Sequence, residues 1–406
     1  MAAKTGGQTA KVAPSSICRD LHLHFSSFID AFVDFSVSGI FFLQNPRSSD
    51  AVPEIRTHYP SQDRLVAVGD LHGDLPKSLQ ALRVADLIDP ASSRWIAGST
   101  TVVQIGDVLD RGPDEIKLLY FLHRLKQDAA SHGGSLLTML GNHEIMNIES
   151  DFRYVDPSAL VHFENWARWY EIGSKMKSLC PQLGVQPDIF RGIPKLLAGI
   201  RDEFQEGFRA RIAALRPDGP ISKRFLSNNP TVLVVGDSVF VHGGLLKDHV
   251  AYGLERINQE VRSWINGLSG RRSPSFVRGR DSVVWLRRFS EESERKCDCS
   301  MLELVLATIP GAKRMIMGHT IQQMGINGVC QNRAIRIDVG LSKGCGNGLP
   351  EVLEIKGGDT KEIRILTSNP IYRKSRMYES GLRDGDKVGL GILLPENRIK
   401  RVEVKA

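Results

Sequence analysis

Short apolar runs rich in β-branched residues alternate with helical patterns from residue 64 onward. Apolar positions at helical spacing predict helices over Lys77–Val84 and Asp114–Ala130. The apolar runs predict strands at Leu65–Val68, Thr101–Ile105, Leu136–Leu140, Thr231–Val235, Val239–Val241, Arg314–Met317 and Ala334–Ile337. Strands that alternate with helices are typical of an α/β fold whose strands are buried. We therefore expect an α/β architecture in which a β-sandwich is flanked by helices.

Two other stretches follow different patterns. Residues 1–63 read as an N-terminal extension to one domain that spans residues 64–406. Residues from about 145 to 229 read as a helical insertion into that domain. Aromatic residues recur there at helical spacing, namely Phe163, Trp166, Trp169 and Tyr170. Such spacing favours core positions, and a lid over a nearby site is the alternative.

The N-terminal extension contains an apolar run between Phe25 and Leu43 that Asp30 and Asp34 interrupt. A carboxylate is costly in lipid, so a docked amphipathic helix is favoured over a membrane span. The first residues lack the basic and then apolar pattern of a secretory signal. We expect a cytoplasmic protein, with mitochondrial targeting as the alternative.

The chain has 53 basic and 46 acidic residues, which gives a formal net charge of +7. These charges are scattered along the chain, and we find no nucleic-acid-binding motif among them. A basic surface of this kind raises the local concentration of anionic ligands. We therefore expect no nucleic-acid partner.

The cysteines show no paired spacing of a zinc finger or of a compact disulfide scaffold. They are Cys18, Cys180, Cys297, Cys299, Cys330 and Cys345. We expect them to be reduced thiols. Cys297 and Cys299 are either a redox-active pair or two incidental surface thiols, and the sequence favours the second reading.

Side chains able to bind metals follow the predicted strands closely, usually beside a glycine. They are Asp70, His72, Asp107, Asn142, His143, His242 and His319. The carboxyl ends of strands in an α/β sheet meet at one edge. One such residue after one strand would more often belong to a turn, but the repetition at successive strand ends predicts a shared site.

The types of these side chains indicate the chemistry. Oxygen and nitrogen donors without a thiolate suit Mn²⁺, Fe or Zn²⁺ better than Ca²⁺ or a structural zinc ion. A carboxylate can bridge two cations, and two cations about 3.5–4 Å apart can acidify a water molecule and stabilise an in-line displacement. We expect two divalent metal ions, with Mn²⁺ favoured.

The chain resembles the phosphoprotein phosphatases within the calcineurin-like metallophosphoesterases, and it is most similar to the plant Shewanella-like protein phosphatases. The resemblance rests on Gly69–Gly73, Gly106–Gly112, Gly141–Glu144, Val241–Gly244 and Gly318-His319. It implies a metallophosphoesterase-type sandwich. It also implies phosphoester hydrolysis on Ser/Thr or Tyr side chains of phosphoproteins, by attack of a hydroxide that bridges two metals.

The resemblance also implies a role for each residue of the site. Asp70, His72 and Asp107 would hold one metal ion, and Asp107 would bridge to a second held by Asn142, His242 and His319. Arg111 would bind the substrate phosphate together with Arg287, for which Arg288 is the alternative. His143 would be the general acid, oriented by Asp110, because an expelled alkoxide needs a proton.

Some residues depart from the eukaryotic phosphatase pattern. Asp74 replaces the usual glutamine, no arginine precedes Asn142, and the loop after Asp338 differs. These departures leave the regulatory partners open. Hydrolysis of a small phosphoester or a dinucleoside polyphosphate is the alternative function. A non-catalytic scaffold that binds phosphoproteins is disfavoured, because His143 and Asp110 are both present.

Overall fold

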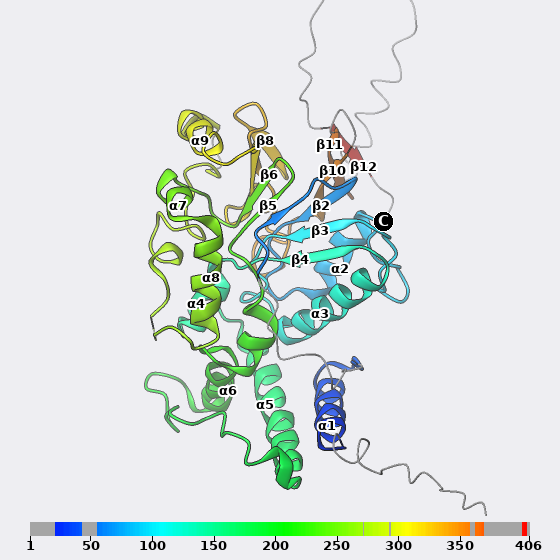
Figure 1. Ribbon diagram of the computed structural model, residues 1–406, viewed down its shortest axis with the longest axis vertical. Coiled ribbons are helices and arrows are strands. Elements are labelled where there is room, and N and C mark those ends of the chain that lie inside the picture. Colours follow the sequence, from blue (N-terminus) through cyan, green and yellow to red (C-terminus); the bar gives the residue numbers. More distant parts are fainter. Residues whose placement is uncertain are drawn as a thin grey trace, which may run out of the picture.

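The computed structural model describes residues 21–42, 55–270, 272–291, 294–357, 362–368 and 400–403. Within these residues the strands form two six-stranded sheets, with the orders β1-β5-β6-β7-β9-β8 and β12-β11-β10-β2-β3-β4 (Figure 1). The strand bounds are β1 His58–Tyr59, β2 Arg64–Val68, β3 Thr101–Gln104, β4 Ser135–Thr138, β5 Val232–Val235, β6 Ser238–Val241, β7 Arg314–Met317, β8 Asn327–Val329, β9 Ala334–Arg336, β10 Glu351–Lys356, β11 Glu362–Thr367 and β12 Lys400–Glu403. All seven strands expected from the apolar runs are present, and the predicted sandwich is confirmed.

Parallel pairing sets the direction in which the strands end. In one sheet β2 is parallel to β3 and β3 to β4. In the other, β6 is parallel to β7 and β7 to β9. The chain therefore leaves several neighbouring strands at the same edge of each sheet, where sites form in α/β proteins.

Apolar side chains fill the space between the two sheets. Successive residues of a strand point to opposite faces. On β2, Leu65 and Ala67 pack in the cluster between the sheets, which also contains Phe240 and Ile335. Val66 and Val68 belong to the other cluster, which includes residues of the flanking helices. Burial of the strands on both faces explains why their sequences are almost continuously apolar.

Helices cover the outer faces of the sandwich. α2 and α3 lie beside the β2-β3-β4 side, and α7, α8 and α9 lie beside the β5-β6-β8 side (Figure 1). The helix bounds are α1 Leu21–Ser38, α2 Leu75–Val84, α3 Glu115–Ser131, α4 Asn142–Ile148, α5 Pro157–Ser178, α6 Gln205–Leu215, α7 Lys247–Tyr252, α8 Leu254–Ile265 and α9 Cys299–Leu306. Asp74 begins α2, because its side chain accepts a hydrogen bond of 3.1 Å from the backbone N–H of Lys77.

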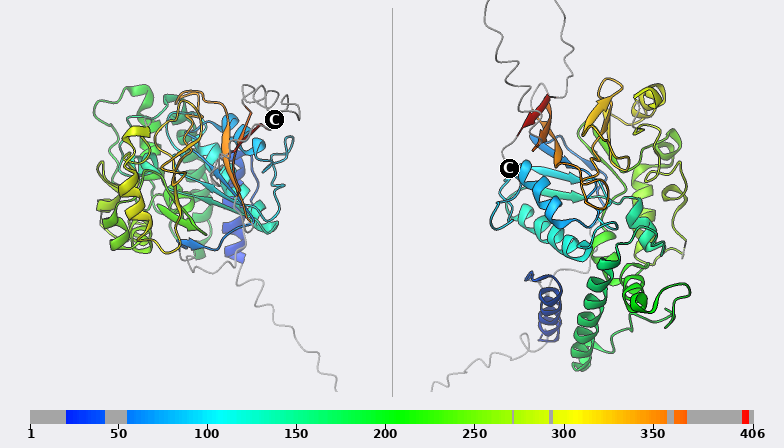
Figure 2. Two further views of the ribbon diagram at one scale, coloured as in Figure 1. Left: turned by 90° about the horizontal axis from the view of Figure 1, so that it is seen from above. Right: turned by 180° about the vertical axis from the view of Figure 1, so that it is seen from behind.

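Helix α1 packs beside α5, as the views from the front and from behind both show (Figures 1 and 2). Phe32 meets Trp169 edge to face. Asp30 bonds Lys177 at 2.7 Å, and the buried Asp34 bonds Arg224 at 2.7 Å. The two carboxylates that interrupt the apolar run thus anchor the helix to the protein, which confirms the docked amphipathic helix. No described helix has the length and apolar character needed to cross a membrane.

The chain between β4 and β5 forms helices and turns without a strand. Trp166 is buried there, and Tyr170 packs against it with ring centroids 5.3 Å apart. Trp169 faces α1. These aromatic side chains are core and docking residues of the helical layer. Their contacts give no support to the lid alternative.

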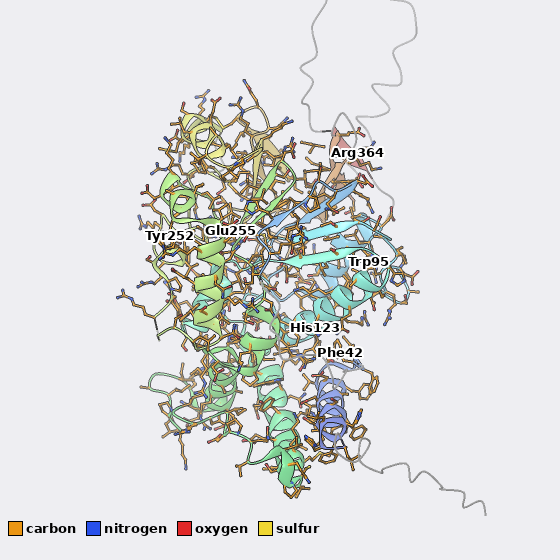
Figure 3. The ribbon with its side chains drawn as sticks, viewed as in Figure 1. Phe42, Trp95, His123, Tyr252, Glu255 and Arg364 are labelled. Carbon is orange, nitrogen blue, oxygen red and sulfur yellow. A yellow bond between two sulfur atoms is a disulfide. The ribbon has the colours of Figure 1, made fainter. Side chains whose placement is uncertain are left out.

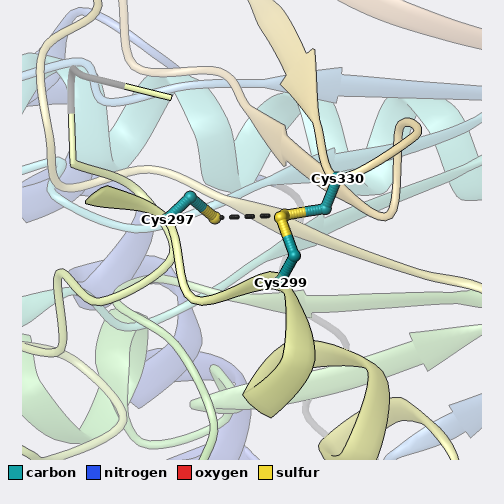
Figure 4. Close-up of side chains that lie close together, drawn as sticks. All are labelled: Cys297, Cys299 and Cys330. Carbon is teal, nitrogen blue, oxygen red and sulfur yellow. Dashed lines mark hydrogen bonds between the residues drawn. A yellow bond between two sulfur atoms is a disulfide. The ribbon is translucent and has the colours of Figure 1, made fainter. Parts of the chain in front are cut away.

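The cysteines differ from the expectation of reduced thiols. Cys299 and Cys330 form a disulfide, and Sγ of Cys297 lies 3.3 Å from Sγ of Cys330 (Figure 4). Cys180, Cys297 and Cys345 are free, and Cys18 lies outside the described residues. The sequence did not reveal this bridge because only the folded chain brings the start of α9 beside the turn after β8.

Candidate metal centre

The loops after five strands converge on the carboxylate of Asp107. Its Oδ2 lies 3.6 Å from Nε2 of His72 and 3.2 Å from Nε2 of His242. Potential ligand atoms of His72, Asp107 and His143 form one compact group, and those of Asp107, His242 and His319 form a second. Asp107 belongs to both groups, which is the geometry expected of a carboxylate that bridges two cations.

The remaining predicted ligands complete this cluster. Oδ1 of Asn142 lies 3.0 Å from Nε2 of His242. Oδ2 of Asp70 accepts a hydrogen bond of 3.1 Å from the backbone N–H of His319. The rings of His242 and His319 are 5.1 Å apart. The structure thus brings together all six residues that the sequence predicted as ligands.

Backbone carbonyls fix the orientation of two of the histidines. Nδ1 of His72 lies 3.0 Å from the carbonyl oxygen of Leu109, and Nδ1 of His242 lies 3.0 Å from that of Ile105. A carbonyl can only accept, so Nδ1 of each ring carries a proton and Nε2 of each ring points into the cluster. Nε2 of His319 is buried and has no hydrogen-bond partner among the described residues. An electron-pair donor left without a partner in this place fits a bound cation.

The electrostatics of the cluster also fit bound cations. Burial, followed by the charges of Asp338 and Asp107, raises the pKa of Asp70 well above its usual value. Burial likewise raises the pKa of Asp338 to about 6, and burial lowers the pKa of His72 to about 4. Several buried carboxylates beside neutral imidazoles need positive charge to be stable. Divalent cations would supply it.

The backbone around the site is strained. His72, Asp107, Asp110, Arg111 and His319 all have positive φ, between 46° and 67°. Each such residue costs on the order of 1–3 kcal/mol, and residues of this kind cluster at functional sites. The surrounding hydrogen bonds hold this conformation.

Glu144 supports the strained loop. Its buried carboxylate accepts hydrogen bonds of 2.8 Å from the backbone N–H groups of Asp107, Val108 and Gly141. It therefore ties the loop after β3 to the loop after β4. The structure therefore shows Glu144 stabilising the loop that carries Asp107.

Two glycines allow the ligands their close approach. A Cβ atom at Gly141 would overlap the carboxylate of Asp107, and one at Gly318 would overlap that of Asp70. Any larger residue would displace a predicted ligand. The sequence placed these glycines beside the ligands, and the structure gives the steric reason.

His143 and Asp110 form a buried pair at the edge of the cluster. Nδ1 of His143 lies 2.6 Å from Oδ2 of Asp110, and its Nε2 lies 3.9 Å from Oδ2 of Asp107. Burial would lower the pKa of His143, but the charges of Asp107 and Asp110 outweigh it and raise the pKa above its usual value. The imidazole is thereby favoured in its protonated form, which can donate a proton.

Two arginines lie beside the cluster. The guanidinium of Arg111 lies 4.4 Å from the ring centroid of Tyr154, a ring that also packs 5.1 Å from that of His143. Nη1 of Arg287 donates to the carbonyl oxygen of His319 at 2.9 Å and to the hydroxyl of Thr320 at 2.8 Å. Arg287 thus lies next to a predicted ligand. No interaction of the Arg288 side chain with the cluster is found among the described residues.

Asp338 and Tyr154 lie beside the cluster and were not among the predicted site residues. Asp338 is buried beside Asp70 and follows β9 as the other ligands follow their strands. Its position shortly after a predicted strand could have identified it from the sequence. Tyr154, between Arg111 and His143, follows no strand, and its place depends on how the chain turns after α4.

The sandwich and its strand-end cluster are those of a metal-dependent phosphoesterase. Residues 63–323 match the family model described as calcineurin-like phosphoesterase. The chain belongs to this family, as the resemblance implied, and the expected class of enzyme, a hydrolase of phosphoric esters, is confirmed with it.

Individual relatives agree with this assignment. The chain is 59% identical to the Shewanella-like protein phosphatase 2 of Arabidopsis thaliana, over 97% of this chain and 98% of that protein. It is 27% identical to the Shewanella-like protein phosphatase 1 of Plasmodium berghei, over 75% and 74% of the two chains. The fold is similar to that of the cold-active protein-tyrosine phosphatase of a Shewanella species, with a TM-score of 0.52, 20% identity and coverage of 79% and 86%.

Proposed function

We propose that this chain is a metal-dependent protein phosphatase that hydrolyses phosphoester bonds on Ser/Thr or Tyr side chains. The observation that carries the proposal is the carboxylate of Asp107, which is shared by two groups of potential metal ligands beside the His143–Asp110 pair. The similarity over nearly the whole chain to a protein named as a protein phosphatase supports a phosphoprotein substrate.

We propose that one metal ion is held by Asp70, His72 and Asp107. A second would be held by Asp107 together with Asn142, His242 and His319. Mn²⁺ is the proposed cation, with Fe or Zn²⁺ as alternatives, because the donors are carboxylate, amide and imidazole without thiolate. Such ions, when bound, supply a nucleophile at neutral pH and neutralise the charge of the reacting phosphoryl group.

The other side chains of the site have complementary roles. Arg111 and Arg287 would bind the phosphate oxygens of the substrate, and the guanidinium fork suits this geometry. His143 would donate the proton on Nε2 to the leaving oxygen of the side chain, while Asp110 keeps the imidazole charged and aimed. A protein that only binds phosphoproteins would have no need of this proton donor.

We also propose the division of the chain into an N-terminal extension, residues 1–63, and a catalytic domain, residues 64–406, with a helical insertion at about 145–229. The family match from residue 63 supports this boundary. His58 and Tyr59 nevertheless pair with β5, so the extension contributes to a sheet of the domain. A chain that begins at residue 64 should therefore unfold at a lower temperature than the full chain.

Steady-state kinetics test the function. Purified protein with Mn²⁺ should release phosphate from a panel of phosphoserine, phosphothreonine and phosphotyrosine peptides, and a chelator should abolish the release. The same protein should be given a dinucleoside polyphosphate in parallel. A larger kcat/KM for the nucleotide than for every peptide would contradict the proposed substrate class, and no hydrolysis of either would contradict the enzyme itself.

A further inference from the structure

Arg211 is a fully buried arginine on α6, in the helical insertion. Its guanidinium bonds two carboxylates. Nη2 donates to Oδ1 of Asp110 at 2.9 Å and to Oε1 of Glu115 at 2.7 Å, and Nη1 donates to Oε2 of Glu115 at 2.5 Å. Nε donates to the side-chain oxygen of Asn147 at 2.8 Å. All three nitrogen atoms of the guanidinium therefore donate hydrogen bonds to residues next to the cluster of potential metal ligands.

These contacts complete the surroundings of Asp110. Oδ1 accepts from Arg211 and, at 2.9 Å, from Nδ2 of Asn147. Oδ2 is left for Nδ1 of His143. Glu115 also accepts from the backbone N–H of Asp110 at 2.5 Å. On the side away from His143, the carboxylate of Asp110 is thus fixed by Arg211 and Asn147, and Glu115 holds the backbone of Asp110.

Arg211 places a positive charge between two buried carboxylates. Asp110 and Glu115 are both completely buried carboxylates, and two such charges close together repel strongly in a medium of low dielectric constant. One guanidinium that bonds both of them offsets this repulsion. The ring of Phe163, 4.6 Å from the guanidinium, helps to exclude water.

From this arrangement we infer that Arg211 is a positioning residue of the reaction. It holds the carboxylate of Asp110 so that His143 stays aimed at the leaving oxygen. The inference rests on the proposed phosphatase function and deepens it. Arg211 itself touches no reacting atom. The helical insertion thereby contributes part of the catalytic machinery through α6, in addition to its packing against α1.

Leaving-group dependence separates this role from a structural one. Protonation by His143 matters for phenyl phosphate, whose leaving group is basic, and little for 2,4-dinitrophenyl phosphate, whose leaving group departs as the anion. With Mn²⁺ supplied, Arg211→Met should lower kcat for phenyl phosphate by about 100-fold, a size typical of general acid catalysis. By the same reasoning kcat for 2,4-dinitrophenyl phosphate should fall by less than about threefold.

Two further variants complete the experiment. Arg209→Met removes an arginine of the same helix that bonds Glu206 and the carbonyl oxygen of Pro194, so the ratio of the two rates should match that of the wild type. Arg211→Lys keeps the positive charge, but its single ammonium group cannot reach Asp110, Glu115 and Asn147 together. For this variant, the ratio of kcat for phenyl phosphate to kcat for 2,4-dinitrophenyl phosphate should lie between the ratios of the wild type and Arg211→Met.

Each outcome decides the inference. Equal losses on both substrates, with metal content unchanged, would show a merely structural role. If Arg211→Met does not fold, Arg211→Lys decides alone, and a wild-type ratio in that variant overturns the inference. A wild-type enzyme that hydrolyses neither aryl phosphate would instead contradict the proposed function, so the two failures are distinguishable.

Discussion

His143 and Asp110 are joined by a hydrogen bond of 2.6 Å between Nδ1 and Oδ2, although Asp110 lies in the loop after β3 and His143 lies in the first turn of α4, after β4. The same imidazole points Nε2 towards Asp107, the carboxylate at the centre of the cluster. Nδ1 is therefore bound to one carboxylate and Nε2 faces another, and the charges of Asp107 and Asp110 raise the pKa of the ring. This relationship connects the cluster of proposed metal ligands to the proposed proton donor.

Replacement of His143 with Asn should lower kcat for phosphopeptides by about 100-fold or more, because a general acid contributes 10²–10⁴-fold. Metal content, measured by elemental analysis of the same preparation, should stay at the wild-type level. Parental activity in this variant would show that the leaving group obtains its proton elsewhere.

Replacement of Asp107 with Asn should lower metal occupancy and activity together, since a neutral amide is a poor bridge between two cations. Elemental analysis and kcat should be measured on one sample. Two metal ions bound at full occupancy in an inactive variant would argue against the bridging role.

Gly318→Ala should weaken metal binding, because the new methyl group would overlap the carboxylate of Asp70. Isothermal titration with Mn²⁺ measures the change in affinity, which we expect to be about 10–100-fold, as for other disturbed ligands. Gly311→Ala is the matched control. It has φ of +73° and open space around it, so it should cost about 1 kcal/mol of stability and leave metal affinity unchanged. The same affinity in both variants would refute the steric argument.

Acid should destabilise the fold through His123. The ring centroid lies 5.3 Å from that of Phe42 (Figure 3) and 5.4 Å from that of Phe225. Burial, helped by the charges of Arg224 and Lys126, lowers its pKa to about 4 from the usual 6.5. The unfolded chain therefore takes up a proton first, so this stabilising contribution is complete above pH 6.5 and is lost as the pH falls to about 4.

The expected loss from this residue is at most about 3 kcal/mol. Urea unfolding of wild type and His123→Gln at a series of pH values measures it as the difference between the two curves. The difference in the free energy of unfolding between the two proteins should narrow as the pH falls. If the difference in the free energy of unfolding between wild type and His123→Gln did not change with pH, His123 would not be the cause of the loss of stability in acid.

Loss of the disulfide should lower stability. The bridge between Cys299 and Cys330 closes a loop with a sequence separation of 31, for which the entropy of the unfolded chain gives roughly 2–4 kcal/mol. Urea unfolding of Cys330→Ala should show a loss of this size, and Cys180→Ala, which removes a free thiol, should change stability by less than about 0.5 kcal/mol. Equal stability of Cys330→Ala and wild type would show that the bridge does not constrain the fold.

Sequence determined seven of the strands and the positions of the proposed ligands at their ends. The apolar runs specified β2, β3, β4, β5, β6, β7 and β9 because a buried strand needs apolar residues on both faces. Asp70 and His319 could be selected because parallel strands end at a common edge. The glycines beside them marked the tight turns.

Tertiary structure alone decided how distant segments meet. The Cys299–Cys330 bridge, the contact of Phe32 with Trp169, and the bonds of Arg211 to Asp110 join residues far apart along the chain. No local pattern encodes such pairs, because hydrophobic periodicity reports only which face of an element is buried. What lies against that face depends on the packing of the whole chain, and this is how an arginine in the helical insertion came to lie behind the predicted proton donor.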